Sequence, residues 1–90
     1  MLQKEIAISN KDGLLARPAA LLVQVASRYE SQVIIRQGNK NINAKSIMGV
    51  LSLGIAQDEM MTLVVDGKDE EAAMDAILKL IDSGFEQMPE

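Results

Sequence analysis

The sequence predicts an α+β fold, in which a four-stranded, mainly antiparallel sheet carries three helices on one face. Three observations lead to this class. The strand and helix patterns alternate in the order βαββαβα. A tight-turn signal at 38–39 joins the second and third strands into a hairpin. The strands also carry polar side chains suited to a solvated face, namely Lys4, Gln32, Arg36 and Thr62.

The first half of the chain supplies three of the expected elements. Residues 2–9 predict a strand, because apolar and polar residues alternate around Ile6 and Ile8. A turn at 10–13 leads into a helix from Ala16 to about Tyr29. Its apolar stripe consists of Ala19, Leu22, Val23 and Ala26. The short β-branched run at 31–37 predicts the second strand.

The second half supplies the other four elements. A short strand is expected at 40–44, then a helix at 47–53 with Ser46 as N-cap and Gly54 as its stop. A strand at 60–66 ends at Gly67. The helix at 69–83 begins with acidic residues that complement its dipole, and Gly84 ends it. The tail at 85–90 is expected to fray.

Composition excludes several classes of function. Ninety residues predict a single domain, 1–90, and hydrophobic residues at 48% with aromatics at 2% predict an aliphatic core. Without cysteine there is no disulfide scaffold or thiolate metal site. Without histidine the commonest general base and imidazole ligand are missing. The carboxylates at 66–71 have no partner base in sequence. We therefore expect no enzyme activity, no metal and no cofactor.

The charge distribution narrows the expected partners. The net charge is −4, with an excess of +4 in residues 1–45 and −8 in residues 46–90. An acidic chain with few aromatics is not expected to bind nucleic acid directly. No apolar run is long enough to cross a membrane, and the first residues do not resemble a signal peptide, so a cytoplasmic location is expected. The basic half suits an acidic protein or a phosphate; alternatively, the asymmetry reflects only the solvated face of the last helix.

Two helix starts are candidate sites. At 13–18, Arg17 and free backbone N–H groups around Pro18 form an arrangement suited to an anion, although Arg17 is equally explained as a surface charge. At 43–49, Ser46 is either a plain cap or a phosphoserine position, because a helix N-terminus stabilises the added negative charge.

The helix at 47–53 is too apolar for all its side chains to be buried. Its apolar residues are Ile47, Met48, Val50, Leu51 and Leu53. We expect Met48 and Leu51 to be exposed, as a partner surface beside Ser46. The alternative is that they are scattered exposed residues of the ordinary kind.

Two segments together resemble the HPr family, the small phosphocarriers of the bacterial sugar phosphotransferase system. They are GLLARPAALLVQVASRYES at 13–31 and INAKSIMGVLSLGIA at 42–56. The resemblance extends from the first strand through the last helix. It implies an open-faced β-sandwich of βαββαβα order, in agreement with the pattern above.

The resemblance also implies what the two sites do. In HPr a histidine precedes the ARPA motif and carries the phosphoryl group; here Leu15 holds that position. Ser46 matches the serine that an ATP-dependent HPr kinase/phosphorylase modifies, which makes HPr a corepressor for the carbon catabolite control repressor. A Crh-like branch of the family lacks the histidine and keeps the serine, and this chain resembles that branch.

By position, the resemblance implies a partner-binding face. It consists of Arg17, Ala20, Gln24, Arg28, Lys45, Ile47, Met48 and Leu51. The two helix starts are expected to lie side by side, so that Arg17 reaches a phosphate on Ser46. The alternative function is a phosphocarrier HPr whose histidine was lost or mutated to Leu15. A purely structural domain is a third alternative.

Overall fold

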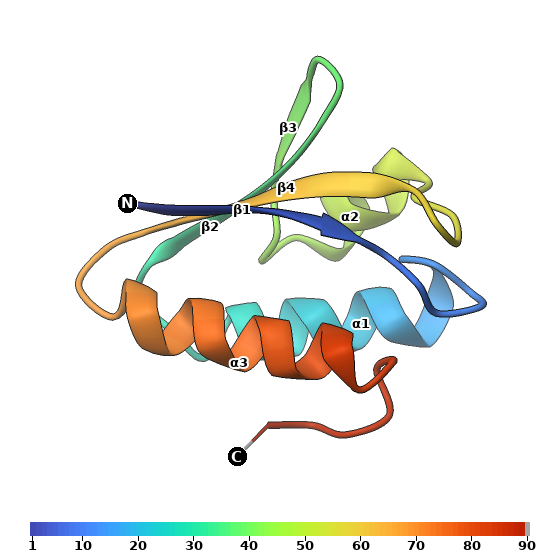
Figure 1. Cartoon of the computed structure of the whole chain (residues 1–90). Helices are drawn as coiled ribbons and strands as arrows, with labels where there is room; N and C mark the ends of the chain where they lie inside the picture. Colours follow the sequence, from blue (N-terminus) through green and yellow to red (C-terminus); the bar gives the residue numbers. More distant parts are fainter. Residues whose placement is uncertain (90) are drawn as a thin grey trace.

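The computed structural model describes residues 1–89 and has the βαββαβα order (Figure 1). The strands are β1 (Leu2–Ala7), β2 (Gln32–Gln37), β3 (Lys40–Asn43) and β4 (Met60–Asp66). The helices are α1 (Ala16–Ala26), α2 (Ile47–Leu53) and α3 (Glu70–Asp82). Every predicted element is present, and α2 has the predicted bounds.

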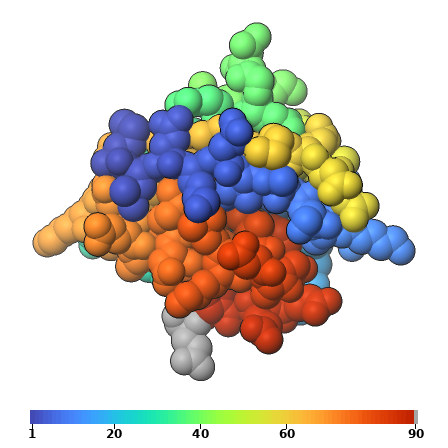
Figure 2. All heavy atoms as spheres, viewed as in Figure 1, coloured from blue at the N-terminus to red at the C-terminus, as the bar shows by residue number. Residues whose placement is uncertain are grey.

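The four strands form one sheet in the order β1-β4-β2-β3, and every neighbouring pair is antiparallel. Helices α1 and α3 lie below the sheet in Figure 1, and α2 packs against α1 and contributes to the same core. This arrangement is the predicted open-faced sandwich. In the space-filling view the β2–β3 hairpin projects beyond the rest of the molecule (Figure 2).

The register assigns each strand residue to a face, because directly opposed residues of antiparallel strands point the same way. Arg36 is opposite Thr62, and Gln32 is opposite Asp66, so these polar residues share the open face as predicted. Lys4 is opposite Leu63, which is fully buried under the helices. The prediction for Lys4 is therefore wrong: it lies on the helix side, where its place on the edge strand β1 leaves it exposed.

The core lies between the sheet and the helices and is almost entirely aliphatic, as the composition predicts. Strand residues such as Val33, Ile35 and Leu63 pack against Leu22 of α1 and Ile77 of α3. Helix α2 contributes Val50 and Leu53. Helix α1 packs against both α2 and α3, so it is the middle element of the helical layer.

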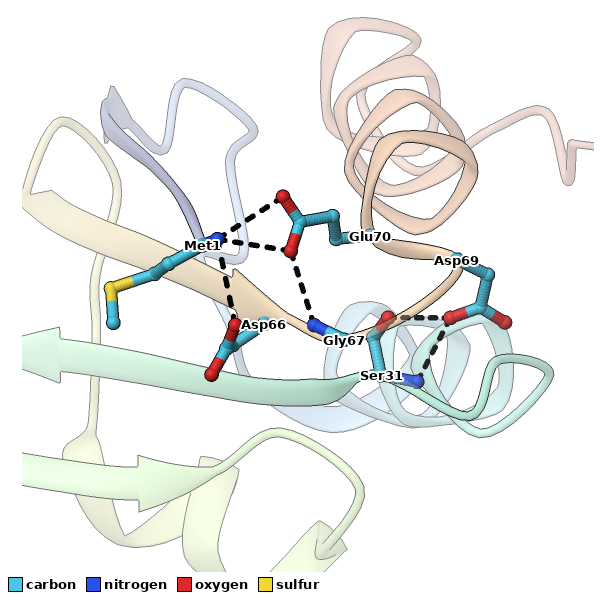
Figure 3. Close-up of polar contacts among 6 residues, drawn as sticks. All are labelled: Met1, Ser31, Asp66, Gly67, Asp69 and Glu70. Carbon is cyan, nitrogen blue, oxygen red and sulfur yellow. Dashed lines mark hydrogen bonds and ion pairs between the residues drawn. The ribbon is translucent and has the colours of Figure 1, made fainter.

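The end of α1 differs from its prediction. The helix ends at Ala26, and Ser27 is its C-cap, three residues before the predicted end near Tyr29. Residues 28–31 instead form a connection that is tied to the start of α3. Asp69 accepts hydrogen bonds from the backbone N–H groups of Glu30 and Ser31, each at 2.9 Å, and from the Ser31 hydroxyl. Figure 3 shows the two bonds from Ser31.

Hydrogen bonds lower the pKa of two carboxyl groups near the start of α3, those of Asp69 and Glu70. The Ser31 hydroxyl, together with the N–H of Glu30, holds the pKa of Asp69 below its ordinary value. The Gly67 N–H donates to Glu70 and likewise lowers the pKa of that carboxyl. The Met1 amine lies 3.0 Å from Oε1 of Glu70 and 3.5 Å from Oδ1 of Asp66 (Figure 3).

The tail after α3 is packed, and the expectation that it frays is wrong for residues 85–89. Phe85 is buried, and its N–H donates to the carbonyl of Leu80 at 3.0 Å. Gln87 N–H donates to the Ser83 hydroxyl at 3.1 Å, and Met88 packs against the core. Burial of Phe85 and Met88, together with these hydrogen bonds, favours the ordered path of the tail. Residue 90 lies outside the described residues.

Candidate functional site

The start of α1 combines a buried, hydrogen-bonded residue, Leu14, with exposed residues at 15–17. Leu14 is fully buried, and its N–H donates to the carbonyl of Ile55 at 2.8 Å. Leu15 is the N-cap, makes no side-chain cap hydrogen bond and is 43% exposed. Ala16 has φ of +52°, a left-handed conformation that is costly for a residue with a Cβ. Arg17 is exposed. The backbone therefore presents residues 15–17 to solvent at the cost of local strain.

Gly13 makes this arrangement possible. Its φ is +61°, and a Cβ built on it would lie 2.3 Å from the carbonyl oxygen of Ile55. Only glycine allows the chain to turn and approach the backbone of 55–56 this closely. The predicted turn at 10–13 is confirmed, and the contact explains the glycine.

A cleft borders this helix start. It is lined by Asn10, Lys11, Asp12, Arg17, Pro18, Gly84, Phe85 and Glu86. Cations and carboxylates are mixed in this lining, so the cleft lacks the single sign of charge that favours a free anion. Among residues 1–89, no cluster of carboxylates is arranged to hold a metal ion.

Ser46 caps α2 as predicted. Its backbone is extended (φ −110°, ψ 116°), and its Oγ accepts a hydrogen bond from the Gly49 N–H at 3.2 Å. Gly54 ends the helix in the left-handed conformation. The Ser46 side chain is exposed. The hydroxyl therefore has one bond to the helix and remains accessible to an enzyme.

One side of α2 is an exposed apolar surface. Met48 is 73% exposed, Ile47 38% and Leu51 37%, whereas Val50 and Leu53 are buried. We refer to Ile47, Met48 and Leu51 as the α2 patch. The predicted exposure of Met48 and Leu51 is confirmed, and Ile47 is exposed as well. A seven-residue helix with one buried face cannot cover all three.

The two helix starts do not lie side by side, so this prediction is wrong. The hydrogen bond from Leu14 to Ile55 joins the start of α1 to the end of α2. At the opposite end, the ammonium of Lys45 donates to the carbonyl of Tyr29 at 2.6 Å, next to the start of α2. The helices therefore run in opposite directions. The start of α1, which Arg17 follows, is therefore at the end of α2, and Ser46 is at its start. A helix of seven residues, about 10 Å long, separates them.

The remaining candidates divide into free and engaged side chains. Gln24 is exposed on α1, and Ala20 is half-buried there. Lys45 is half-buried and bonded to the Tyr29 carbonyl, in the connection that follows α1. Arg28 lies beyond the end of α1, and its guanidinium donates to the carbonyl of Pro89 at 2.5 Å. The predicted face thus contains two cations already bonded within the chain, which sequence spacing did not indicate.

The sequence and the fold of this chain are similar to those of known proteins. The family model for the phosphorylation site of the HPr component of the phosphotransferase system matches residues 2–83. A crystal structure of HPr-C-His from Thermoanaerobacter tengcongensis superposes with a TM-score of 0.94 at 48% identity, covering 99% of this chain and 100% of that chain.

Curated relatives of two kinds are similar to nearly the same degree. The HPr-like protein Crh of Halalkalibacterium halodurans is 45% identical over 91% of this chain and 98% of its own length. The phosphocarrier protein HPr of Treponema pallidum is 42% identical over 97% of this chain and 99% of its own length. The chain therefore belongs to the HPr family, whose members are non-catalytic phosphocarrier and HPr-like proteins of the cytoplasm.

Proposed function

We propose that the chain is a regulatory phosphoprotein of the HPr family, modified on Ser46 by an ATP-dependent HPr kinase/phosphorylase. The single observation that carries the proposal is the pairing of Leu15 with Ser46. Leu15 stands at the family's phosphohistidine position, and its hydrocarbon side chain has no atom that accepts a phosphoryl group. The sequence has no histidine elsewhere to replace it. Ser46 is exposed and caps α2.

Phosphorylation at Ser46 is compatible with the local geometry. The added group would carry about −1.5 to −2 charges at pH 7, at a helix start where such charge is stabilised. The order of α2 would be retained, and the main change would be a new negative charge beside the α2 patch. In this role the protein acts as a corepressor that docks on the carbon catabolite control repressor.

The antiparallel arrangement of α1 and α2 separates the start of α1 from Ser46, which affects how a partner can dock. The start of α1 lies at the end of α2, and Ser46 lies at the start of α2, with the α2 patch between them. Arg17 follows this start of α1 and lines the cleft with Phe85 and Glu86. We propose that a partner contacts both ends at once, and that Arg17 binds the partner rather than the phosphate. Gln24 and Ala20 on α1 complete this face. The roles of Lys45 and Arg28 would require their release from Tyr29 and Pro89.

The test is phosphate uptake with the kinase and ATP. Wild type is expected to take up one phosphate per chain, and Ser46→Ala none. Ser52→Ala is the matched control, because Ser52 lies in the same helix and its hydroxyl donates to the Gly49 carbonyl at 2.6 Å. Its uptake should equal that of wild type. Full uptake by Ser46→Ala, or no uptake by wild type, would contradict the proposal.

A phosphocarrier that lost its histidine is the second candidate, favoured by the similar identity to the Treponema pallidum phosphocarrier. This candidate is tested most directly by incubating the Leu15→His variant with phosphoenolpyruvate and enzyme I. Phosphorylation of that variant would mean that the docking surface for enzyme I is intact. Failure of a correctly folded variant would favour specialisation for regulation.

A further inference from the structure

Methionine is the only sulfur-containing residue of this chain, which has six methionines and no cysteine. A thioether reacts with peroxide to form a sulfoxide, and exposure controls how readily this happens. The methionines differ widely in exposure: Met48 is 73% exposed and Met60 48%, whereas Met61 is 2% and Met74 8%. The structure therefore sorts them into reactive and protected positions.

Met48 combines high exposure with a place in the proposed docking surface. It lies two residues after Ser46, and the α2 patch surrounds it with Ile47 and Leu51. Met1 is as exposed as Met48, but it precedes β1, where Leu2 is opposite Val65 of β4. Met60 belongs to β4. Only at Met48 would oxidation place a polar group in the α2 patch.

We propose that Met48 is a redox modification site, at which oxidation by hydrogen peroxide weakens docking of the HPr kinase/phosphorylase on the α2 patch beside Ser46. The docking part of this proposal rests on the proposed function. In the reaction, the sulfur lone pair attacks one peroxide oxygen and the O–O bond breaks. An S–O bond forms and water leaves. The sulfur loses two electrons, and the peroxide is reduced. Methionine sulfoxide reductases reverse the change.

The physical effect follows from burying a strong acceptor. A thioether adapts to an apolar surface, whereas a sulfoxide oxygen must keep a hydrogen-bond donor when a partner covers it. Ile47 and Leu51 offer no side-chain donor. Oxidation should therefore reduce phosphorylation of Ser46 by its kinase at least fivefold, without unfolding the chain, because Met48 takes no part in the core.

The first experiment treats the folded protein with hydrogen peroxide and follows each methionine by peptide mass mapping. Met48 is expected to gain oxygen at least twice as fast as Met60, and at least tenfold faster than Met61 and Met74. A Met48 rate no higher than that of Met60 would overturn the assignment of the reactive site.

The second experiment measures the polarity of the surface and then its function. Retention on a phenyl matrix should fall on peroxide treatment for wild type and Met60→Leu, and change least for Met48→Leu. Ser46 phosphorylation should fall for the same two proteins. Equal losses in Met48→Leu would overturn the proposal. If untreated protein takes up no phosphate, the proposed function fails, while mapping and retention still decide whether Met48 is the redox site of the surface.

Discussion

The two ends of α1 are built in different ways. Before its start, buried backbone at 13–14 is held against residues 55–56, and Leu15 and Arg17 then project into solvent. After its end, side chains from distant segments lock the chain: Lys45 bonds to Tyr29, and Asp69 to residues 30–31. The start of α1 therefore exposes its side chains, whereas the segment after its end is bonded to Asp69 and to Lys45, the residue directly before Ser46.

The largest effect is expected from disturbing the start of α1 at its base. Gly13→Ala places a Cβ 2.3 Å from the Ile55 carbonyl oxygen, in a left-handed conformation. We expect the free energy of unfolding, measured by urea denaturation, to fall by about 3 kcal/mol.

Gly38→Ala is the matched control for this variant, since Gly38 has φ of +60° but a Cβ added there would meet no atom within 4 Å. It should cost only about 1 kcal/mol, from conformation alone. Equal losses in the two variants would mean that the close approach at Gly13 contributes nothing.

The next effect is a pH-dependent loss of stability from the hydrogen bonds that Asp69 accepts from Glu30 and Ser31. The Ser31 hydroxyl and the Glu30 N–H lower the pKa of this carboxyl, so the folded state binds its proton less tightly than the unfolded state. The stabilisation is present above pH of about 4 and is lost as the pH falls through the lowered pKa. Asp69→Asn should therefore flatten the fall in stability below pH of about 4. Asp82→Asn, at an exposed position of α3, is the control, and an equal flattening there would contradict the assignment.

A smaller loss of stability is expected when the hydrogen bond between Lys45 and Tyr29 is removed. Lys45→Met keeps most of the length of the side chain but deletes the ammonium that bonds to the Tyr29 carbonyl. We expect the free energy of unfolding to fall by about 1 kcal/mol, because the Tyr29 carbonyl loses a charged donor. Lys11→Met, in an exposed turn, should change it by less than about 0.5 kcal/mol. If the Lys45 variant is as stable as the Lys11 variant, the hydrogen bond from Lys45 to Tyr29 does not stabilise the fold.

The smallest effect is a gain in stability, and it tests the backbone strain at the start of α1. Ala16→Gly relieves the left-handed strain at φ of +52°, and we expect a gain of about 0.5 kcal/mol in unfolding free energy. Ala20→Gly, within the regular part of α1, should instead lose about 1 kcal/mol. Thermal denaturation of both variants checks the prediction, and a loss at position 16 as large as that at position 20 would argue against strain.

Local signals account for the elements that were predicted well. Helix α2 has its predicted bounds because Ser46 and Gly54 act on their immediate neighbours. Non-local contacts account for the errors. Tyr29 lies outside α1 in a connection held by Asp69, nearly forty residues away, and no local pattern indicates that contact. The direction of α2 relative to α1 is likewise set by the sheet connections, so the spacing of Arg17 and Ser46 could not be predicted from local pattern.

The position of β1 in the sheet has a consequence for how the chain folds during synthesis. Within residues 1–89 its one neighbouring strand is β4, and Ala7 pairs with Met60, more than fifty residues later. During synthesis β1 therefore emerges well before β4, the strand with which it pairs. We expect the hairpin of β2 and β3 to form earlier, because its strands are close in sequence. Folding of this domain should therefore be completed only after β4 has emerged, with β1 added to an already assembled hairpin and strand.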